Sequence, residues 1–118
     1  MRRILAAALV LTVGTALAFA TVAVAATIRG TQGNDSLIGG PDPDRIIALD
    51  GNDLIDGGGG NDLINAGKGD DMVSAGSGDD TVFSRDGEAD AVDCGAGDDT
   101  VTADVFDTLT GCENARVT

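Results

Sequence analysis

The 118-residue sequence contains no histidine, tryptophan or tyrosine, and only three phenylalanines. Without histidine, the chain has no imidazole to activate a serine or cysteine nucleophile or to bind a metal ion. Without tryptophan and tyrosine, it lacks the aromatic rings on which sugars and nucleic-acid bases usually stack. These absences exclude histidine-dependent hydrolases and imidazole metal sites.

Positive charge is also scarce. Seven Lys and Arg residues stand against 20 Asp and Glu residues, which gives a net charge of −13 at pH 7. A chain of this charge repels the phosphates of nucleic acids and the surfaces of anionic membranes. We therefore expect neither nucleic acid nor a membrane surface as a partner.

The first 25 residues differ in composition from all that follows. Arg2 and Arg3 precede an uncharged, alanine-rich stretch, residues 4–26, which contains the small-x-small sequence Ala23-Val24-Ala25. This pattern predicts a secretory signal peptide over residues 1–25 and an extracellular mature chain, residues 26–118. An uncleaved membrane anchor is the alternative, because the apolar run is long enough to span a bilayer.

Residues 26–118 have a composition that opposes folding. They retain five basic residues against all 20 acids, a net charge of −15, and 19 of the 93 residues are Leu, Ile, Val or Phe. So few large apolar side chains do not offset the conformational entropy and charge repulsion of an ordered chain. The chain is therefore either disordered or neutralised by a bound cation.

From Gly33 onward, the sequence is organised in units of about nine residues. Three successive units are GNDLIDGGG (51–59), GNDLINAGK (60–68) and GDDMVSAGS (69–77). Every unit contains an Asp, one variable residue and then a bulky apolar residue. The aspartates of this pattern are spaced by five steps of nine and then by ten, nine and eight; they are Asp35, Asp44, Asp53, Asp62, Asp71, Asp80, Asp90, Asp99 and Asp107.

The glycines between these triplets exclude a long helix over residues 30–112, because each glycine costs a helix about 1 kcal/mol. The apolar residue suits a strand, but only about three residues remain between the glycine-rich turns, and so short a strand is unstable alone. Stacking many such strands in parallel coils would bury one continuous apolar line.

The units 57–65, 66–74 and 75–83 resemble the nonapeptide G-G-x-G-x-D-x-U-x, with U a bulky apolar residue, of the RTX or haemolysin-type calcium-binding repeats. The resemblance extends over about residues 30–110. It implies an all-β fold, a parallel β-roll or right-handed β-solenoid. In such a roll, six residues of each unit turn and hold calcium, three form a strand, and two units complete one coil.

The resemblance makes Ca²⁺ the expected cofactor, since calcium prefers six to eight carboxylate and carbonyl oxygens. Turns two units apart would lie on the same edge, about 4.8 Å apart, where aspartates repel one another unless a cation lies between them. We expect one file of sites at Asp35, Asp53, Asp71, Asp90 and Asp107 and another at Asp44, Asp62, Asp80 and Asp99. Backbone carbonyls are expected to complete the coordination at Gly51, Gly60, Gly69, Gly78 and Gly97.

Three turns depart from the repeat. The turn at residues 39–43 contains two prolines, that at 84–89 is one residue longer, and that at 103–106 is one shorter. These departures weaken the predicted sites at Asp44, Asp90 and Asp107. The remaining acids are expected to form a solvated face; they are Asp50, Asp56, Asp86, Glu88, Asp93, Asp104 and Glu113.

Cys94 and Cys112 are the only cysteines, and they are 18 residues apart. In the implied roll this separation is one full coil, which would place them on the same edge in adjacent layers. One strand spacing lies within the Cα–Cα range of disulfides, about 4.4–6.8 Å. With secretion to an oxidising compartment, this predicts a disulfide that staples the C-terminal coil. A thiolate metal site or redox pair is the alternative, although the chain has no C-x-x-C motif.

The sequence thus predicts a secreted, non-enzymatic, calcium-binding protein over residues 26–118, folded by Ca²⁺ bound between stacked Gly/Asp turns. Calcium ions are the expected partners, and the pattern names no protein or glycan partner. The alternatives are an extracellular adhesion or matrix module, or a remnant of a larger RTX enzyme or adhesin. Because the repeats fill the mature chain, we expect no catalytic residues.

Overall fold

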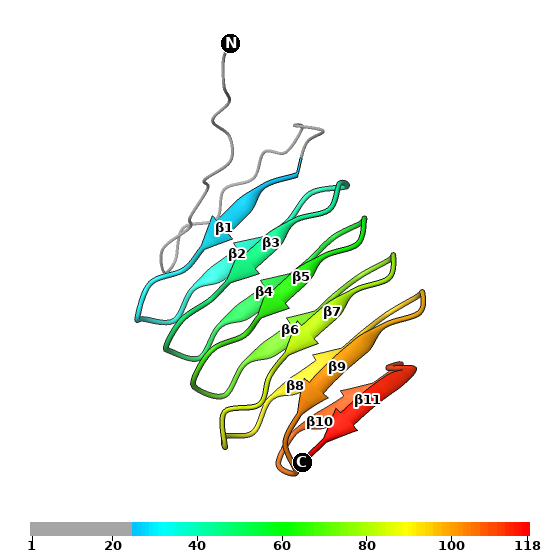
Figure 1. Cartoon of the computed structure of the whole chain (residues 1–118). Helices are drawn as coiled ribbons and strands as arrows, with labels where there is room; N and C mark the ends of the chain where they lie inside the picture. Colours follow the sequence, from blue (N-terminus) through cyan, green and yellow to red (C-terminus); the bar gives the residue numbers. More distant parts are fainter. Residues whose placement is uncertain (1–24) are drawn as a thin grey trace.

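The computed structural model describes residues 25–118, so the predicted signal peptide lies outside the described residues except for Ala25. This part of the chain folds entirely as β-strands joined by turns (Figure 1). It includes no helix of the length and apolarity that a membrane crossing requires. The strands are β1 (Thr27–Arg29), β2 (Ser36–Ile38), β3 (Arg45–Ile47), β4 (Leu54–Asp56), β5 (Leu63–Asn65), β6 (Met72–Ser74), β7 (Thr81–Phe83), β8 (Ala91–Asp93), β9 (Thr100–Ala103), β10 (Thr108–Thr110) and β11 (Asn114–Val117).

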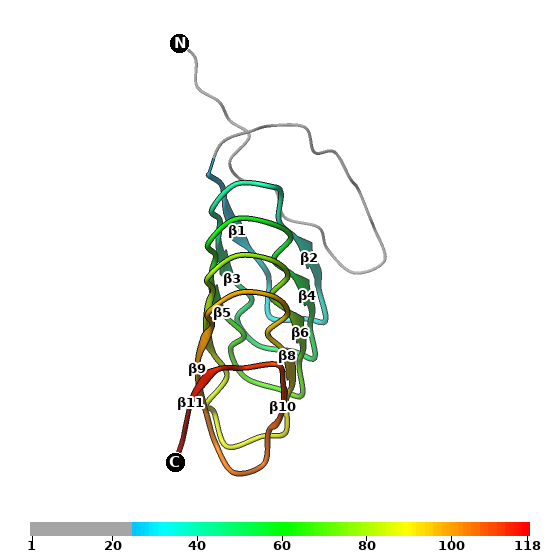
Figure 2. The ribbon, with the colours of Figure 1, turned by 90° about the vertical axis from the view of Figure 1, so that its right-hand side faces the viewer.

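Successive strands lie alternately in two parallel sheets. The odd-numbered strands form a six-stranded sheet in the order β1-β3-β5-β7-β9-β11, and the even-numbered strands form a five-stranded sheet in the order β10-β8-β6-β4-β2. Two repeats therefore make one coil, and the coils stack along one axis (Figure 2). The predicted all-β fold, a parallel β-roll, is confirmed.

The strand register follows the repeat length. Ile46 pairs with Ile64, 18 residues later, and Leu37 pairs with Ile55 in the opposite sheet. Strand pairs that span the ten-residue unit are 19 residues apart, as in the pairing of Val73 with Val92, and the next pair on that sheet, Val92 with Leu109, is 17 apart. The turns thus absorb every change in repeat length, and the apolar residues stay aligned.

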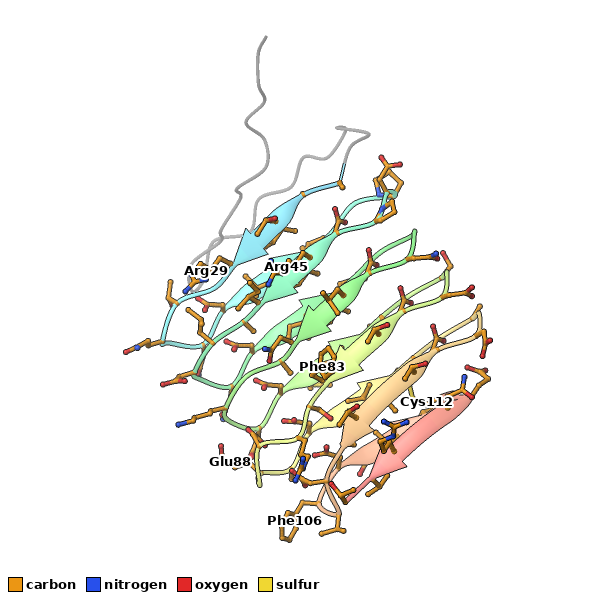
Figure 3. The ribbon with its side chains drawn as sticks, in the orientation of Figure 1. Arg29, Arg45, Phe83, Glu88, Phe106 and Cys112 are labelled. Carbon is orange, nitrogen blue, oxygen red and sulfur yellow. A yellow bond between two sulfur atoms is a disulfide. The ribbon has the colours of Figure 1, made fainter. Side chains whose placement is uncertain are left out.

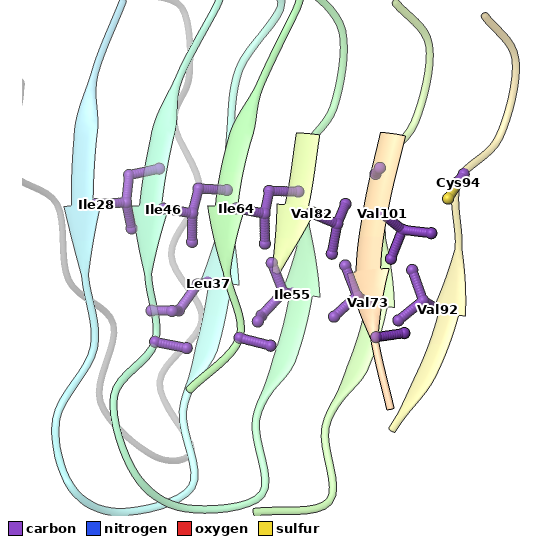
Figure 4. Close-up of a cluster of buried hydrophobic side chains, with 14 residues drawn as sticks. Ile28, Leu37, Ile46, Ile55, Ile64, Val73, Val82, Val92, Cys94 and Val101 are labelled. Carbon is purple, nitrogen blue, oxygen red and sulfur yellow. The ribbon is translucent and has the colours of Figure 1, made fainter. Parts of the chain in front are cut away.

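The core is a double line of side chains between the two sheets (Figure 4). The central residue of each three-residue strand points inward, while the first and third residues point outward. From Ile28 to Val101 these central residues are at most 3 % exposed. They are Ile28, Leu37, Ile46, Ile55, Ile64, Val73, Val82, Val92 and Val101. Small buried residues at or just beyond the ends of the strands complete the core, among them Ala48, Ala66, Ala75, Cys94 and Ala103.

Cys94 and Cys112 form a disulfide, with their Cα atoms 5.1 Å apart. Cys94 is fully buried, and its bond links the turn after β8 to the turn before β11. The predicted pairing is confirmed, and the thiolate alternative is wrong. The bond fastens the last coil to the one before it.

Candidate metal centres at the turns

The turns stack so closely that glycine is required at several positions. Gly67 has a φ of +85°, and a Cβ there would overlap the carbonyl oxygen of Leu49 in the preceding coil. In the same way, a Cβ at Gly69 would overlap the carbonyl oxygen of Gly51. Positive φ and close backbone approach are what glycine alone allows. The glycines thus bring carbonyl oxygens of one turn directly against the next.

The predicted aspartates of one edge form a ladder of hydrogen bonds from coil to coil. The main-chain N–H of Asp35 donates to Oδ1 of Asp53 at 2.8 Å, and that of Asp53 donates to Oδ1 of Asp71 at 2.8 Å. Asp71 donates to Asp90 at 2.7 Å, and Asp90 donates to Asp107 at 2.9 Å. Asp107 therefore keeps its place in the file although the turn before it is one residue short.

The opposite edge carries a second ladder of the same kind. Asp44 donates to Oδ1 of Asp62 at 2.8 Å, and Asp62 donates to Oδ1 of Asp80 at 2.8 Å. Asp80 donates in turn to Asp99 at 2.7 Å, and Asp99 donates to Oε1 of Glu113 at 3.1 Å. The structure thus brings the nine predicted aspartates together in the two expected files.

The second carboxylate oxygen of most ladder aspartates is buried and accepts no hydrogen bond. This holds for Oδ2 of six residues, each at most 2 % exposed: Asp53, Asp62, Asp71, Asp80, Asp90 and Asp99. A buried acceptor without a donor costs about 1–3 kcal/mol, and more when the group is charged. Six such oxygens in two files are what a row of cations would satisfy.

Burial raises the pKa values of these carboxyl groups. The loss of hydration raises the pKa of Asp71 to about 8, and the carboxylates of Asp90 and Asp53 add to the rise. Burial raises the pKa of Asp62 and of Asp90 to about 7, and that of Asp53 and of Asp80 to about 6. In each group the ladder hydrogen bond only partly opposes this rise. Near neutral pH the ladder therefore favours a proton or a cation.

The two aspartates of the first coil are placed differently. Asp35 accepts hydrogen bonds from the main-chain N–H and the hydroxyl of Thr31. Oδ2 of Asp44 accepts the N–H of Gly40 at 2.7 Å, and its Oδ1 accepts the N–H of Ala26 at 2.9 Å. Local donors thus satisfy both carboxylates at the N-terminal end of each file.

The two irregular turns on the first edge are held by the carboxylate of Asp104, which we expected to be solvated. Asp104 is 5 % exposed and accepts the N–H groups of Phe106, Asp86 and Gly87. The hydrogen bond from Phe106, followed by that from Gly87, lowers the pKa of Asp104. The prediction of a solvated Asp104 is wrong, because this shortened turn has lost its glycines and a side chain supplies the acceptors.

Glu113 is exposed, as expected, but its place as the last acceptor of the second ladder was not predicted. It stands 14 residues after Asp99, where the repeat predicts 18, and no glycine motif precedes it. The nine-residue pattern contains no signal for this role, and only the position of Glu113 in the fold shows it. Like every ladder aspartate, Glu113 comes directly before the first residue of a strand, here β11.

The arrangement of the turns suits a calcium site that combines carboxylates with main-chain carbonyls, rather than a metal site made of side chains alone. Within residues 25–118, no three His, Cys, Asp or Glu side chains are grouped closely enough to hold a metal ion. An ion here would need carboxylates from neighbouring turns together with main-chain carbonyls. Calcium accepts such mixed oxygen shells of six to eight ligands. The unpartnered Oδ2 atoms and the stacked carbonyls therefore fit Ca²⁺.

A family model described as the RTX calcium-binding nonapeptide repeat (4 copies) matches residues 29–64, 38–73 and 56–89. Together these matches extend over residues 29–89, which is just over half of the chain. They include six of the nine ladder aspartates. Comparisons with curated proteins and with solved structures gave no match.

Proposed function

The chain belongs to the family of RTX calcium-binding nonapeptide repeat proteins, and on that premise we propose that it is a secreted, non-enzymatic protein folded by the calcium it binds. The observation that carries this proposal is the set of six buried Oδ2 atoms without a hydrogen-bond donor. A fold that leaves six buried carboxylate oxygens unpaired gains stability from any cation that reaches them.

The proposed ligands form two files. Asp53, Asp71 and Asp90 would hold ions on one edge, and Asp62, Asp80 and Asp99 would hold ions on the other. Main-chain carbonyls at Gly51, Gly60, Gly69, Gly78 and Gly97 would complete the shells. Asp35 and Asp44 would contribute less, because their carboxylates already accept local N–H groups. The bound ion would supply the positive charge that the stacked carboxylates lack.

Binding and folding would be one process in this protein. The mature chain carries a net charge of −15, so its coils repel one another when no cation is bound. Metal affinity that exists only in the folded state adds directly to folding stability. Extracellular calcium modules bind calcium with dissociation constants of about 10⁻⁴–10⁻³ M. With an affinity in this range, the chain would be unfolded inside a cell and would fold after it reaches calcium outside.

Two observations support secretion and a non-catalytic role. The Cys94–Cys112 disulfide suits an oxidising compartment, in agreement with the leader predicted over residues 1–25. The chain has no histidine, and its buried aspartates are all engaged in the two ladders or in the turn at Asp104. Among the described residues these buried carboxylates serve the stacking of the turns, which supports a structural rather than a catalytic role.

The test compares the mature chain in millimolar calcium with the same chain after metal removal. At about pH 8, where the ladder carboxyl groups are largely ionised, we expect circular dichroism to show β structure only with calcium, and native mass spectrometry to count several bound ions. Magnesium at equal concentration is the control, because its smaller octahedral shell fits this mixed site poorly. Identical spectra with and without calcium, and no bound ion, would refute the proposal.

A further inference from the structure

The outward side chains of the two sheets form two flat faces of opposite charge. Face A, the first and third residues of β1, β3, β5, β7, β9 and β11, carries Arg29, Arg45 and Arg116 and no acid. Face B, the first and third residues of β2, β4, β6, β8 and β10, carries Asp56 and Asp93 and no Lys or Arg. Arg29 and Arg45 lie on face A in Figure 3. A strongly acidic protein thus presents one basic face and one acidic face.

Both faces also expose large apolar side chains. On face A, Leu63 is 40 % exposed and Phe83 is 42 % exposed. On face B, Leu54 is 55 % exposed and Met72 is 60 % exposed. Leu54 and Met72 are partners in register on adjacent strands, and contiguous exposed apolar side chains are typical of a surface that binds another molecule. Each face combines such groups with charge of a single sign.

Face B is hollowed where face A has a protruding ring. A groove of about 270 Å³ on face B is lined by Met72, Ala91, Thr108 and their neighbours. The small side chain of Ala91 sits between the longer ones of Met72 and Thr108 in the same row. On face A the large outward side chain at the corresponding level is Phe83, on β7.

We propose that face A of one copy packs on face B of a second copy in the same orientation, so that copies stack as an open-ended array. The chain runs out along one sheet and returns along the other. The first residues of face A and the third residues of face B therefore lie beside the same edge of the roll. A copy displaced straight outward keeps this correspondence.

One register of this stack places a basic side chain of face A over an acidic side chain of face B. The same register places the ring of Phe83 over the groove of face B. With β3 over β4, Arg45 lies over Asp56 and Ile47 lies over Leu54. In that register β7 lies over β8, which places Phe83 over Ala91. The register holds along the whole face, because both sheets belong to the same coils and share one strand spacing, and within it Arg45 and Asp56 form the one pair of opposite charges. With β3 over β2 instead, Arg45 would lie over Ile38 and Phe83 over Met72, and both matches are lost.

Contacts between like faces are disfavoured. Face A on face A brings three arginines against three arginines, and face B on face B brings acids against acids. Like charges in contact across an interface cost several kcal/mol. The favoured contact joins two different patches, and such a contact between copies in one orientation does not close into a ring. The product is an array that grows at both faces.

A single contact of this kind is small. Face B offers two outward residues on each of five strands, fewer than the roughly 20–30 residues a side of a standard interface. Assembly therefore requires a high local concentration. The stack also rests on the proposed function, because copies with a net charge of −15 repel one another until calcium neutralises their turns.

Sedimentation velocity of the mature chain in calcium, over a rising protein concentration, tests the stack. We expect the weight-average mass to increase with concentration for the wild type and to stay monomeric for Arg45→Glu and for Ala91→Arg. Both substitutions fit the fold, since outward positions of other strands already hold charged side chains. Lys68→Glu makes the same charge change as Arg45→Glu but lies on a turn, and it should assemble like the wild type.

Two further arms test the geometry. Arg45→Glu has an intact face B and Ala91→Arg has an intact face A, so their mixture should form 1:1 dimers and nothing larger. The double variant Arg45→Asp/Asp56→Arg exchanges the two charges and should restore assembly. A wild type that remains monomeric while binding calcium overturns the stack and leaves the proposed function standing. Assembly without calcium uptake does the reverse, and assembly that neither single variant changes overturns the faces named here.

Discussion

The main-chain N–H of Asp99 donates to Oε1 of Glu113, 3.1 Å away and 14 residues later. Every earlier rung of this ladder spans 18 or 19 residues and ends on an aspartate. The longer glutamate side chain thus completes a file where the chain has left the repeat. The ladder ends on a residue that belongs to no nonapeptide.

Glu113→Ala should destabilise the calcium-bound protein, because the N–H of Asp99 loses its acceptor. A lost partner for a buried donor costs about 1–3 kcal/mol, and urea unfolding in calcium would measure it. Glu113→Gln keeps a carbonyl oxygen at the same reach and should unfold near the wild-type midpoint. Equal losses in both variants would contradict a hydrogen-bonding role.

Asp62→Asn should act in opposite directions with and without calcium. The amide keeps an oxygen for the N–H of Asp44 but removes a buried charge, so the metal-free chain should become more compact. Calcium affinity at that file should fall about tenfold or more, since a contact between unit charges near a protein surface is worth a few kcal/mol. Calorimetric titration with calcium would measure the affinity.

Asp70→Asn is the matched control for that substitution. It makes the same charge change at an exposed position, and the chain already carries asparagine at the equivalent positions 52 and 61. Its calcium titration should follow that of the wild type. A control that loses as much affinity as Asp62→Asn would show that overall charge, rather than the ladder, governs binding.

Acid should stabilise the metal-free fold. Burial raises the pKa of Asp53 to about 6 and of Asp71 to about 8, from an ordinary value of 3.8. The folded chain therefore binds these protons more tightly than the unfolded chain, and this stabilisation is complete below about pH 4 and lost as pH rises through 6 to 8. Circular dichroism of metal-depleted protein should show β structure increasing from pH 8 to pH 5. An increase in the other direction would contradict the burial of these groups.

Substitution of two glycines with nearly equal φ distinguishes the cost of steric overlap from the cost of backbone strain. Gly67 has a φ of +85° with no room for a Cβ, whereas Gly87 has a φ of +91° and nothing within 4 Å. Gly87→Ala should cost about 1–2 kcal/mol, the strain of a left-handed alanine. Gly67→Ala should cost at least about 3 kcal/mol, because overlap with Leu49 is added. Denaturation in calcium would compare them, and equal costs would argue against tight stacking of the turns.

Breaking the disulfide should loosen the last coil first. Closure of a loop of this length is worth about 3 kcal/mol, so Cys94→Ala/Cys112→Ala should lower unfolding stability by about that amount. Alanine fits the site, since Ala48 and Ala66 occupy the equivalent buried position. Hydrogen exchange should speed up in β10 and β11 before the remaining strands. Reduction of the wild type is the control and should reproduce both effects.

The sequence predicts most of the fold because two residues of each unit face the same way. Asp53 and Ile55 are two positions apart, so both side chains point inward from one edge of the roll. That pairing recurs at nearly constant spacing, which fixes the strands, the two files and the coil length. The cysteine separation then follows as one coil.

Other features depend on geometry that the nine-residue pattern does not contain. Asp104 and Glu113 act from irregular turns, where only the folded chain shows which N–H groups lack acceptors. The difference in charge between faces A and B is not evident from the sequence for another reason. Neighbouring units contribute to opposite sheets, so Arg45 and Asp56 look like scattered surface charges until alternate units are aligned.

Because successive units alternate between the two sheets, the number of residues that such a protein can gain or lose without disturbing its fold is restricted. Gain of 18 residues inserts one more layer and keeps every later side chain on its original sheet. Gain of nine residues between Cys94 and Cys112 would carry the second thiol to the far edge, out of reach of the first. Natural variants that gain or lose sequence between the two cysteines should therefore do so by even numbers of units. Insertions of an odd number of units should occur only outside the segment that the disulfide closes.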